Sequence, residues 1–238
     1  MFKHWLLMLV LSCPFVLKAQ VAVVFAGAGT CDGCAEAVAL LLQQQQYQVR
    51  LVDEHQLQTA TLQGASLYVQ PGGSDDIMDT LTVLSASQIQ SIRDFVKQGG
   101  NYLGICAGGY LAGQYTDQAA GSKAFALVEL AEIDQEITGD NSAQFISLRL
   151  PGEASTRNVY YQAGPHFGST LPANGKALAY YAGSNHIAAR ISDYGKGRVG
   201  LIGPHYEADA SWYAADQLPV NAAQHQDLFF RMLRQLRQ

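Results

Sequence analysis

Short apolar runs alternate with helix-patterned stretches along the first half of the chain. Continuous apolar runs are typical of strands that are buried on both faces, and they predict strands over residues 21–25, 48–52, 66–70 and 101–105. The intervening pattern predicts helices over residues 35–46, 87–98 and 107–113. This alternation of strand and helix favours a mostly parallel sheet that is covered by helices on both sides.

The second half of the chain is less regular and richer in short strands. Apolar runs predict strands over residues 145–150, 159–161, 177–181, 186–191 and 198–202. The last segment, residues 222–237, predicts an amphipathic helix with these residues on its apolar side: Leu228, Phe229, Met232, Leu233 and Leu236. We therefore predict a flavodoxin-like α/β fold with a β-rich second half, as a single domain over residues 20–238.

The first 19 residues have the pattern of a secretory signal peptide. Lys3 lies in a short basic region, the apolar stretch after it is too short to span a bilayer, and Pro14 ends that stretch. Cleavage is expected after Ala19, although the residue three before the cut is larger than usual. The alternative is a lipoprotein with its lipid on Cys13, which Leu11 and the short apolar stretch disfavour. We expect a periplasmic or secreted protein with no stable membrane insertion after cleavage.

The charge balance and the glycine spacing restrict the classes of partner and cofactor that this chain is expected to bind. The chain has 15 Lys and Arg against 20 Asp and Glu, and loss of Lys3 and Lys18 with the signal peptide would leave 13 against 20. This acidic balance disfavours a nucleic-acid partner. Gly27 and Gly29 lack the third glycine and the later acidic residue of a dinucleotide fingerprint, so no cofactor is expected. The oligomeric state is not predicted.

Cys106 stands where an apolar run ends abruptly between two glycines. Gly104 and Gly108 complete the pattern G-x-C-x-G, and such small neighbours suit a nucleophile on a sharp, strained turn from strand to helix. The start of the following helix would activate the thiol and stabilise an oxyanion. The alternative is an inert buried cysteine. The two flanking glycines favour the interpretation of Cys106 as a nucleophile.

A histidine and a carboxylate follow the predicted strand at residues 198–202. His205 and Glu207 are two residues apart, so in extended backbone they project to one side, and the carboxylate could hold the imidazole that accepts the Cys106 proton. His166 competes, since both histidines follow Gly-Pro and precede an aromatic residue. Only His205 follows a strand and has a carboxylate two residues later. The other histidines are interpreted as structural or solvated: His55, His186 and His225.

The remaining cysteines are spaced for a local disulfide. Cys31 and Cys34 lie at the start of a predicted helix, and their pairing would leave Cys106 as the free thiol once Cys13 is removed. A redox-active C-x-x-C is the alternative, although no thioredoxin-like pattern surrounds it. No second ligand pair at zinc spacing appears, so no metal site is expected.

Together these features resemble the class I glutamine amidotransferase-like superfamily, and most closely the N-terminal domain family of biotin–protein ligases. The resemblance is carried by the first predicted strand with its glycine-rich turn and by residues 68–73, 95–110, 160–165 and 195–207. The resemblance implies that Cys106 is the nucleophile, His205 the general base and Glu207 its orienting partner. It also implies an oxyanion hole, built from the backbone N–H groups of three residues: Gly72, Gly73 and Ala107.

No ligase domain accompanies these motifs, so no biotin ligation is expected. The expected function is cysteine-dependent hydrolysis of a small amide or peptide. The alternative is a non-catalytic module that binds a small metabolite or peptide in the same pocket. That pocket is predicted from five residues: Tyr110, Tyr160, Tyr161, Gln162 and His166. For His166, capping of a surface turn is an equal alternative.

Two groups of acidic residues are open to more than one interpretation. Asp75 and Asp76 could contact a cationic or amine-bearing substrate, although helix capping or a solvated loop is favoured. The acidic side chains of the irregular half are interpreted as a solvated face rather than a metal site. They are Glu129, Glu132, Asp134 and Glu136.

Overall fold

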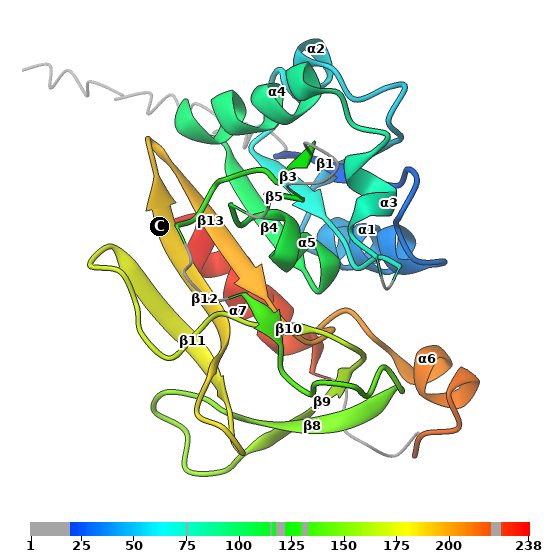
Figure 1. The fold of residues 1–238 in the computed structure, drawn as a ribbon, viewed down its shortest axis with the longest axis vertical. Coiled ribbons are helices and arrows are strands. Elements are labelled where there is room, and N and C mark those ends of the chain that lie inside the picture. Colours follow the sequence, from blue (N-terminus) through cyan, green and yellow to red (C-terminus); the bar gives the residue numbers. More distant parts are fainter. Residues whose placement is uncertain (1–19, 75, 115, 118–121, 130–132, 220–224) are drawn as a thin grey trace, which may run out of the picture.

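The computed structural model describes residues 20–238 except 75, 115, 118–121, 130–132 and 220–224. The predicted signal peptide, with Cys13, lies outside the described residues, as do Asp75 and Glu132. A nine-stranded sheet with the order β2-β1-β3-β4-β13-β12-β11-β8-β9 organises the chain (Figure 1). No helix in the described part of the chain has the length and apolar character needed to cross a bilayer.

The first five strands of this order run parallel. β1 (Val21–Phe25) lies between β2 (Gln48–Val52) and β3 (Leu67–Gln70), and β4 (Asn101–Ile105) lies between β3 and β13 (Gly197–Ile202). This is the flavodoxin-like strand order. The predicted strands of this half are confirmed, with boundaries that differ by at most one residue.

The other strands of the sheet run antiparallel. β13 is followed outward by β12 (Ile187–Tyr194), β11 (Gly175–Tyr181), β8 (Gln144–Arg149) and β9 (Arg157–Tyr161). The β-rich second half is therefore confirmed. His186 directly precedes β12, although the sequence predicted it to be the first residue of that strand. β12 also continues three residues beyond the predicted end at residue 191.

Two pairs of short strands lie outside the main sheet. β5 (Thr116–Asp117) pairs with β6 (Ser122–Lys123), and β7 (Asp134–Gln135) pairs with β10 (Pro165–His166). Strands of two residues give no measurable alternation in a sequence, which is why none of them was predicted.

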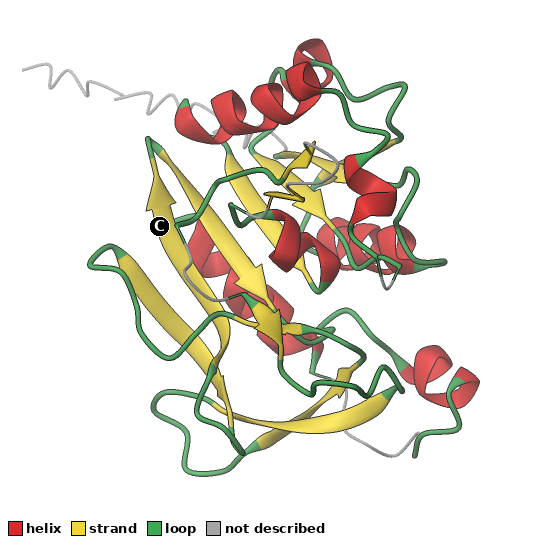
Figure 2. Ribbon diagram, viewed as in Figure 1, coloured by secondary structure: helices red, strands yellow, loops and turns green. Residues whose placement is uncertain are grey.

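Helices cover both faces of the sheet (Figure 2). Side chains of α1 (Cys34–Gln44) and α7 (Gln226–Leu236) share one core cluster with the sheet, and those of α2 (Thr59–Leu62), α3 (Met78–Leu81) and α4 (Ala86–Lys97) share another. The helices predicted at α1, α4 and α7 are confirmed with shifted ends, although residues 222–224 of the last one lie outside the described part. α2 and α3 are too short to produce a helical period and were not predicted.

Two further short helices lie close to the carboxyl ends of the parallel strands. α5 (Ala107–Leu111) follows β4 and is two residues shorter than predicted, and α6 (Ala210–Ala215) follows β13 and was not predicted. The central strand β13 packs closely against α7: a Cβ on Gly200 would lie only 2.7 Å from the Met232 sulfur. The strands that lead to α5 and α6 are thus fixed by the core.

Candidate active site

Three neighbouring parallel strands deliver the predicted site residues to one edge of the sheet. β3 ends just before Gly72, β4 just before Cys106, and β13 shortly before His205. Carboxyl ends of parallel strands meet at the same edge, which is where open α/β sheets bind ligands. The Cys106 N–H donates to the Ile202 carbonyl oxygen at 2.9 Å, so backbone pairing holds together the segments that carry Cys106 and His205.

Cys106 occupies a strained turn between β4 and α5. Its φ of 49° and ψ of −109° are rarely adopted by residues with side chains, and such strain is commonly found at functional sites. A Cβ on Gly104 would overlap the Gly108 carbonyl, and one on Gly108 would overlap the Gln70 carbonyl. The thiol is free and buried, with its sulfur 3.6 Å from the Gln162 carbonyl oxygen. The predicted elbow is therefore present.

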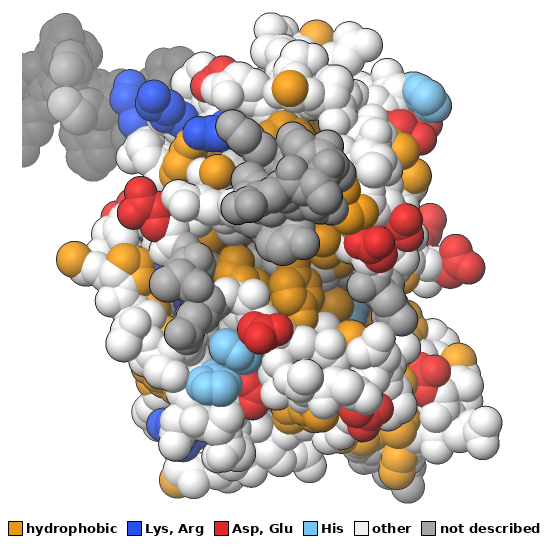
Figure 3. Space-filling model, viewed as in Figure 1, with side chains coloured by type: hydrophobic (Ala, Val, Ile, Leu, Met, Phe, Trp, Pro, Cys, Tyr) orange, Lys and Arg blue, Asp and Glu red, His pale blue; other side chains and the backbone are white. Residues whose placement is uncertain are grey.

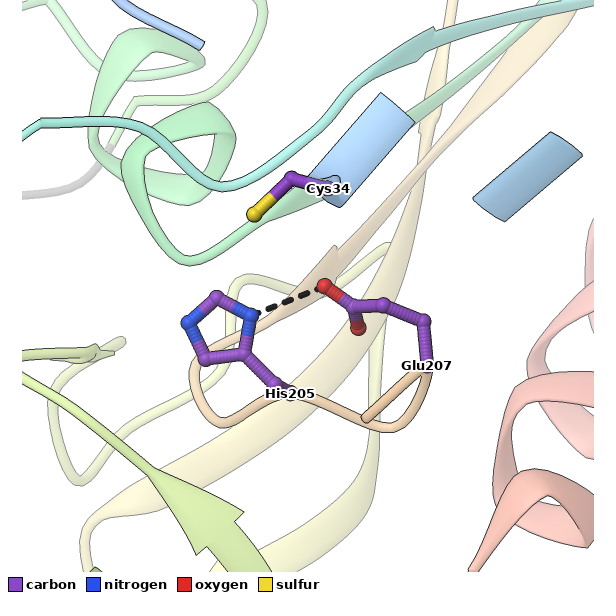
Figure 4. Close-up of side chains that lie close together, drawn as sticks. All are labelled: Cys34, His205 and Glu207. Atoms are coloured by element: carbon purple, nitrogen blue, oxygen red, sulfur yellow. Dashed lines mark hydrogen bonds and ion pairs between the residues drawn. The ribbon is translucent and has the colours of Figure 1, made fainter. Parts of the chain in front are cut away.

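His205 and Glu207 form a buried pair. His205 Nδ1 lies 2.8 Å from Glu207 Oε1, and the two side chains are 5% and 0% exposed (Figure 4). The His205 backbone N–H donates to the Tyr160 carbonyl oxygen at 2.9 Å, which fixes the place of the ring. Within the described residues, Glu207 Oε2 has no hydrogen-bond partner. The carboxylate is thus committed to orienting the imidazole.

The surroundings of the His205 imidazole favour its protonated form. Burial lowers its pKa, but the Glu207 carboxylate and then Cys106, through charge and hydrogen bonding, outweigh burial and raise the pKa to about 10. Since Nδ1 is held by Glu207, the other ring nitrogen is left for the thiol. The structure therefore places the three predicted residues in one site, where Cys106 and His205 line the same cavity and Glu207 holds the imidazole.

The glycines after β3 let the backbone approach this pair. A Cβ on Gly72 would lie 2.6 Å from His205 Cε1, and one on Gly73 would lie 2.9 Å from Ala107 Cβ. Gly73 is also bridged to Thr30, in the loop that follows β1. The backbone of this turn is thus placed against the elbow. Its role as an oxyanion hole stays a prediction.

The Cys31–Cys34 disulfide is formed and lies in the wall of the site. The Cys31 N–H donates to the Gly72 carbonyl oxygen at 3.2 Å, and a Cβ on Gly72 would lie 3.3 and 3.4 Å from the two sulfurs. The Cys34 sulfur points toward His205 and Glu207 (Figure 4). The sulfur, one ring nitrogen of His205 and one carboxylate oxygen of Glu207 all lie within 4.8 Å of one another. The disulfide therefore supports the Gly72 turn, a place that the spacing of the cysteines could not reveal.

A cavity of about 1150 Å³ opens over the thiol and the imidazole. Tyr110, Tyr160 and Gln162 line it as predicted, and Trp212 of α6 lines it without having been predicted. Tyr160 and Trp212 have ring centroids 5.4 Å apart, and Trp212 is also 5.4 Å from the His205 ring. Cys106 and His205 thus have an aromatic wall beside them.

Two residues that were assigned to this pocket are not part of its lining. Tyr161 is fully buried on the other side of β9 and donates its hydroxyl hydrogen to the Gly164 carbonyl at 3.0 Å, because successive strand residues point to opposite faces. His166 is also buried, and its ring lies 4.1 Å from the ring of His186. Tyr161 is therefore corrected to a packing residue. His166, whose Nδ1 accepts the Gly168 N–H at 3.2 Å, caps its own turn instead of lining the cavity.

Comparison with known proteins places this site in context. Residues 20–134 match the family model described as the N-terminal part of biotin–protein ligase. The resemblance to this family is confirmed. The matched region contains Cys106 and the glycines after β3, whereas His205 and Glu207 lie beyond it. A biotin–protein ligase of Schizosaccharomyces pombe is 27% identical over 195 residues, which are 69% of this chain and 29% of that protein. The chain thus spans less than a third of the curated relative.

Solved structures share the fold of this chain. A chain of PurLQS from Thermotoga maritima has a TM-score of 0.64 at 15% identity and covers 92% of this chain and 100% of its own. A glutamine amidotransferase from the same organism has a TM-score of 0.58 at 16% identity, with coverages of 92% and 93%. The fold is therefore that of the glutamine amidotransferase-like proteins.

Two groups of side chains in the described part of the chain could hold a metal ion: Cys34 with His205 and Glu207, and Glu136 with His166 and His186. In the first, the Cys34 sulfur is tied up in the disulfide. In the second, His186 Nδ1 lies 2.9 Å from Glu136 Oε2. Glu136 is thus a buried partner of a histidine, which corrects its assignment to a solvated face.

Removal of the disulfide is expected to weaken both the fold and the site. The double variant Cys31→Ser, Cys34→Ser should lower the free energy of unfolding by about 1–3 kcal/mol, since the closed loop is short, and should slow alkylation of Cys106. Urea unfolding and iodoacetamide kinetics measure the two effects. Asp32→Ser, in the same loop, is the matched control. An unchanged alkylation rate in the double variant would limit the disulfide to stability.

Proposed function

We propose that this protein is a cysteine-dependent amidohydrolase that acts on a small amide or peptide, and that it does so after export. The observation that carries the proposal is the buried His205–Glu207 pair, 2.8 Å apart, with a cationic imidazole beside the free thiol of Cys106. Thiols are activated by this kind of neighbour. The strained turn at Cys106 and the cavity above it give further support.

In the first step, the Cys106 proton resides on His205 as a thiolate–imidazolium pair, and the thiolate attacks the amide carbon so that a carbon–sulfur bond forms. The carbonyl electrons move onto oxygen, and the backbone N–H groups of Gly73 and Ala107 are proposed to stabilise that oxyanion. Glu207 holds the imidazole by Nδ1, so that the opposite ring nitrogen faces the reacting atoms. The groups required for attack are thus supplied by three neighbouring strand ends.

In the second step, the carbon–nitrogen bond breaks and the His205 imidazolium gives its proton to the leaving amine, which leaves a thioester on Cys106. Water then attacks the thioester carbon, and His205 takes a proton from that water. The carbon–sulfur bond breaks, which releases the carboxylic acid and restores the Cys106–His205 pair with its shared proton. The net reaction converts amide and water into carboxylic acid and amine. It consumes no other reactant.

The proposal is tested by the alkylation rate of Cys106 at neutral pH. Replacement of His205 by alanine should slow reaction with iodoacetamide by about 10²-fold, the usual contribution of a positioned proton-transfer group. Because the His205 pKa is raised to about 10, the imidazolium is present at neutral pH, so the difference should be largest near pH 7. It should shrink as the pH rises past about 8.5, where an unassisted thiol ionises by itself.

His55→Ala is the matched control for this measurement, because its side chain is 85% exposed. Circular dichroism of each variant checks that the fold is retained. Equal alkylation rates in the wild-type protein and a folded His205→Ala variant would contradict the amidohydrolase and favour the non-catalytic binding module. That module would occupy the same cavity without forming a thioester.

A further inference from the structure

Acidic side chains dominate the charged lining of the cavity. Four aspartates line it, and no lysine or arginine does so among the described residues. They come from four separate segments of the chain: Asp32, Asp76, Asp134 and Asp216. On the face shown in Figure 3, acidic side chains flank the central hollow, whereas Lys and Arg gather toward the left edge. A concave surface lined by one sign of charge concentrates ligands of the opposite sign.

Asp216 is linked to the catalytic histidine through a single side chain. Its Oδ2 accepts a hydrogen bond from the Tyr160 hydroxyl at 2.7 Å, and the Tyr160 ring lies 5.7 Å from the His205 ring in an edge-on arrangement. Burial, and then this hydrogen bond and the charge of Asp216, raise the pKa of Tyr160. The Asp216 charge is therefore felt close to the reacting atoms.

Asp134 brings a second charge to the same cavity from β7. The Tyr110 hydroxyl donates to the Ala163 carbonyl at 3.0 Å, and burial, then Cys106 and more weakly Asp134, raise the pKa of Tyr110. One carboxylate oxygen of Asp76 is already hydrogen-bonded, since Oδ1 accepts the Met78 N–H at 2.8 Å at the start of α3. The capping role expected for Asp76 is present, but its charge still borders the cavity.

The charges nearest the reaction do not offset these aspartates. The His205 imidazolium is paired with Glu207 and faces Cys106, so it is not available to a substrate carboxylate. The aromatic faces of Trp212 and Tyr160 suit a protonated nitrogen, because cations are attracted to aromatic rings. An anionic substrate would instead meet unpaired negative charge at the cavity wall.

We infer that the cavity selects a cationic amide, in which a protonated amine or similar group lies a few carbons from the amide that Cys106 attacks. This inference rests on the proposed function, since it names the substrate class of the same site. The ammonium group would lie near Asp216 and Asp134 and against the aromatic wall, while the amide reaches the thiol. The aspartates are substrate-positioning residues in this arrangement, and the chemistry stays with Cys106 and His205.

The test uses three primary amides of equal chain length that differ in charge: 5-aminopentanamide, pentanamide and 5-amino-5-oxopentanoate. The second-order rate of ammonia release by the wild-type protein should fall from cation to neutral amide to anion, by about tenfold at each step. Calorimetric binding to the Cys106→Ser variant should follow the same order. Added salt should compress both series, since exposed charges are screened.

Charge-neutral variants identify the groups responsible. Asp216→Asn keeps an acceptor for the Tyr160 hydroxyl, and this variant and Asp134→Asn should each reduce the preference for the cation severalfold. Asp193→Asn changes the net charge equally, but its side chain lies outside the cavity lining and is 60% exposed. It should leave the preference unchanged.

Equal binding of the three amides, a preference for the anion, or no binding of any of them at their solubility limit would overturn the inference. Preferential binding of the cation by Cys106→Ser without ammonia release by the wild-type protein would support the substrate class and contradict the hydrolytic function. Cys106-dependent ammonia release with no charge preference would do the reverse. The two proposals can therefore fail separately.

Discussion

Replacement of Cys106 by alanine is expected to reduce amide hydrolysis at least about 10³-fold, because loss of a nucleophile leaves only binding and oxyanion stabilisation. The fold should be retained. The sulfur contacts the Gln162 carbonyl oxygen at 3.6 Å and interacts with His205, which stays paired with Glu207, and alanine keeps the same backbone. The free energy of unfolding should therefore change by no more than about 1 kcal/mol. Product release on the preferred amide and urea unfolding of the same preparation measure the two quantities.

Cys106→Ser is the matched variant for this experiment, since it preserves the shape of the side chain while replacing the thiol with a poorer nucleophile. Both variants should be inactive and both should be folded. Hydrolysis that survives in either folded variant at the wild-type rate would exclude Cys106 as the nucleophile. Loss of activity accompanied by unfolding would instead indicate that Cys106 is needed for packing.

Replacement of Gly108 by alanine is expected to have the largest effect on stability among single methyl additions near the site. The new Cβ would overlap the Gln70 carbonyl and lie 3.0 Å from the Gln70 Cβ, so relief requires movement of the backbone at the end of β3. Gln70 is 1% exposed and accepts a hydrogen bond from the Tyr68 hydroxyl at 2.8 Å. We expect a loss of about 2–3 kcal/mol and a fall in Cys106 reactivity.

Gly183→Ala provides the control for Gly108→Ala. No heavy atom lies within 4 Å of a Cβ built there, and its φ lies outside the left-handed region. This variant should change the free energy of unfolding by less than about 1 kcal/mol, in either direction. Urea titration of the two variants side by side measures the difference. Equal stabilities would mean that the chain after Cys106 tolerates side chains, which is incompatible with a tightly packed elbow.

The parts of the site that follow directly from strand ends were predictable. Continuous apolar runs marked β3, β4 and β13, and a thiol and a histidine directly after two of them pointed to one edge of a parallel sheet. Tyr161 was assigned wrongly although the rule that excludes it was available. It follows Tyr160 in β9, and adjacent residues of one strand cannot both face the same cavity.

Other features of the site depend on contacts between segments that are far apart in the sequence, and no local sequence pattern reveals such contacts. Trp212 and Asp216 lie in and after α6, a helix of six residues that gives no readable period. The disulfide reaches the site because β1 and β3 are neighbours in the sheet, so the loop after β1 meets the turn after β3. A flavodoxin-like fold was predicted, but the strand order that places β1 beside β3 was not. The cysteine spacing by itself did not reveal this contact.

The backbone pairing of β4 with β13 has a consequence for the nascent chain. Cys106 is synthesised about 100 residues before His205, and β13 must insert between β4 and β12 before the two can meet. Contacts of such large sequence separation carry a high loop-closure cost and form slowly. An emerging or partly folded chain thus holds the thiol without the His205 side chain beside it. Under the proposed function, the nucleophile would become reactive only when the centre of the sheet is complete.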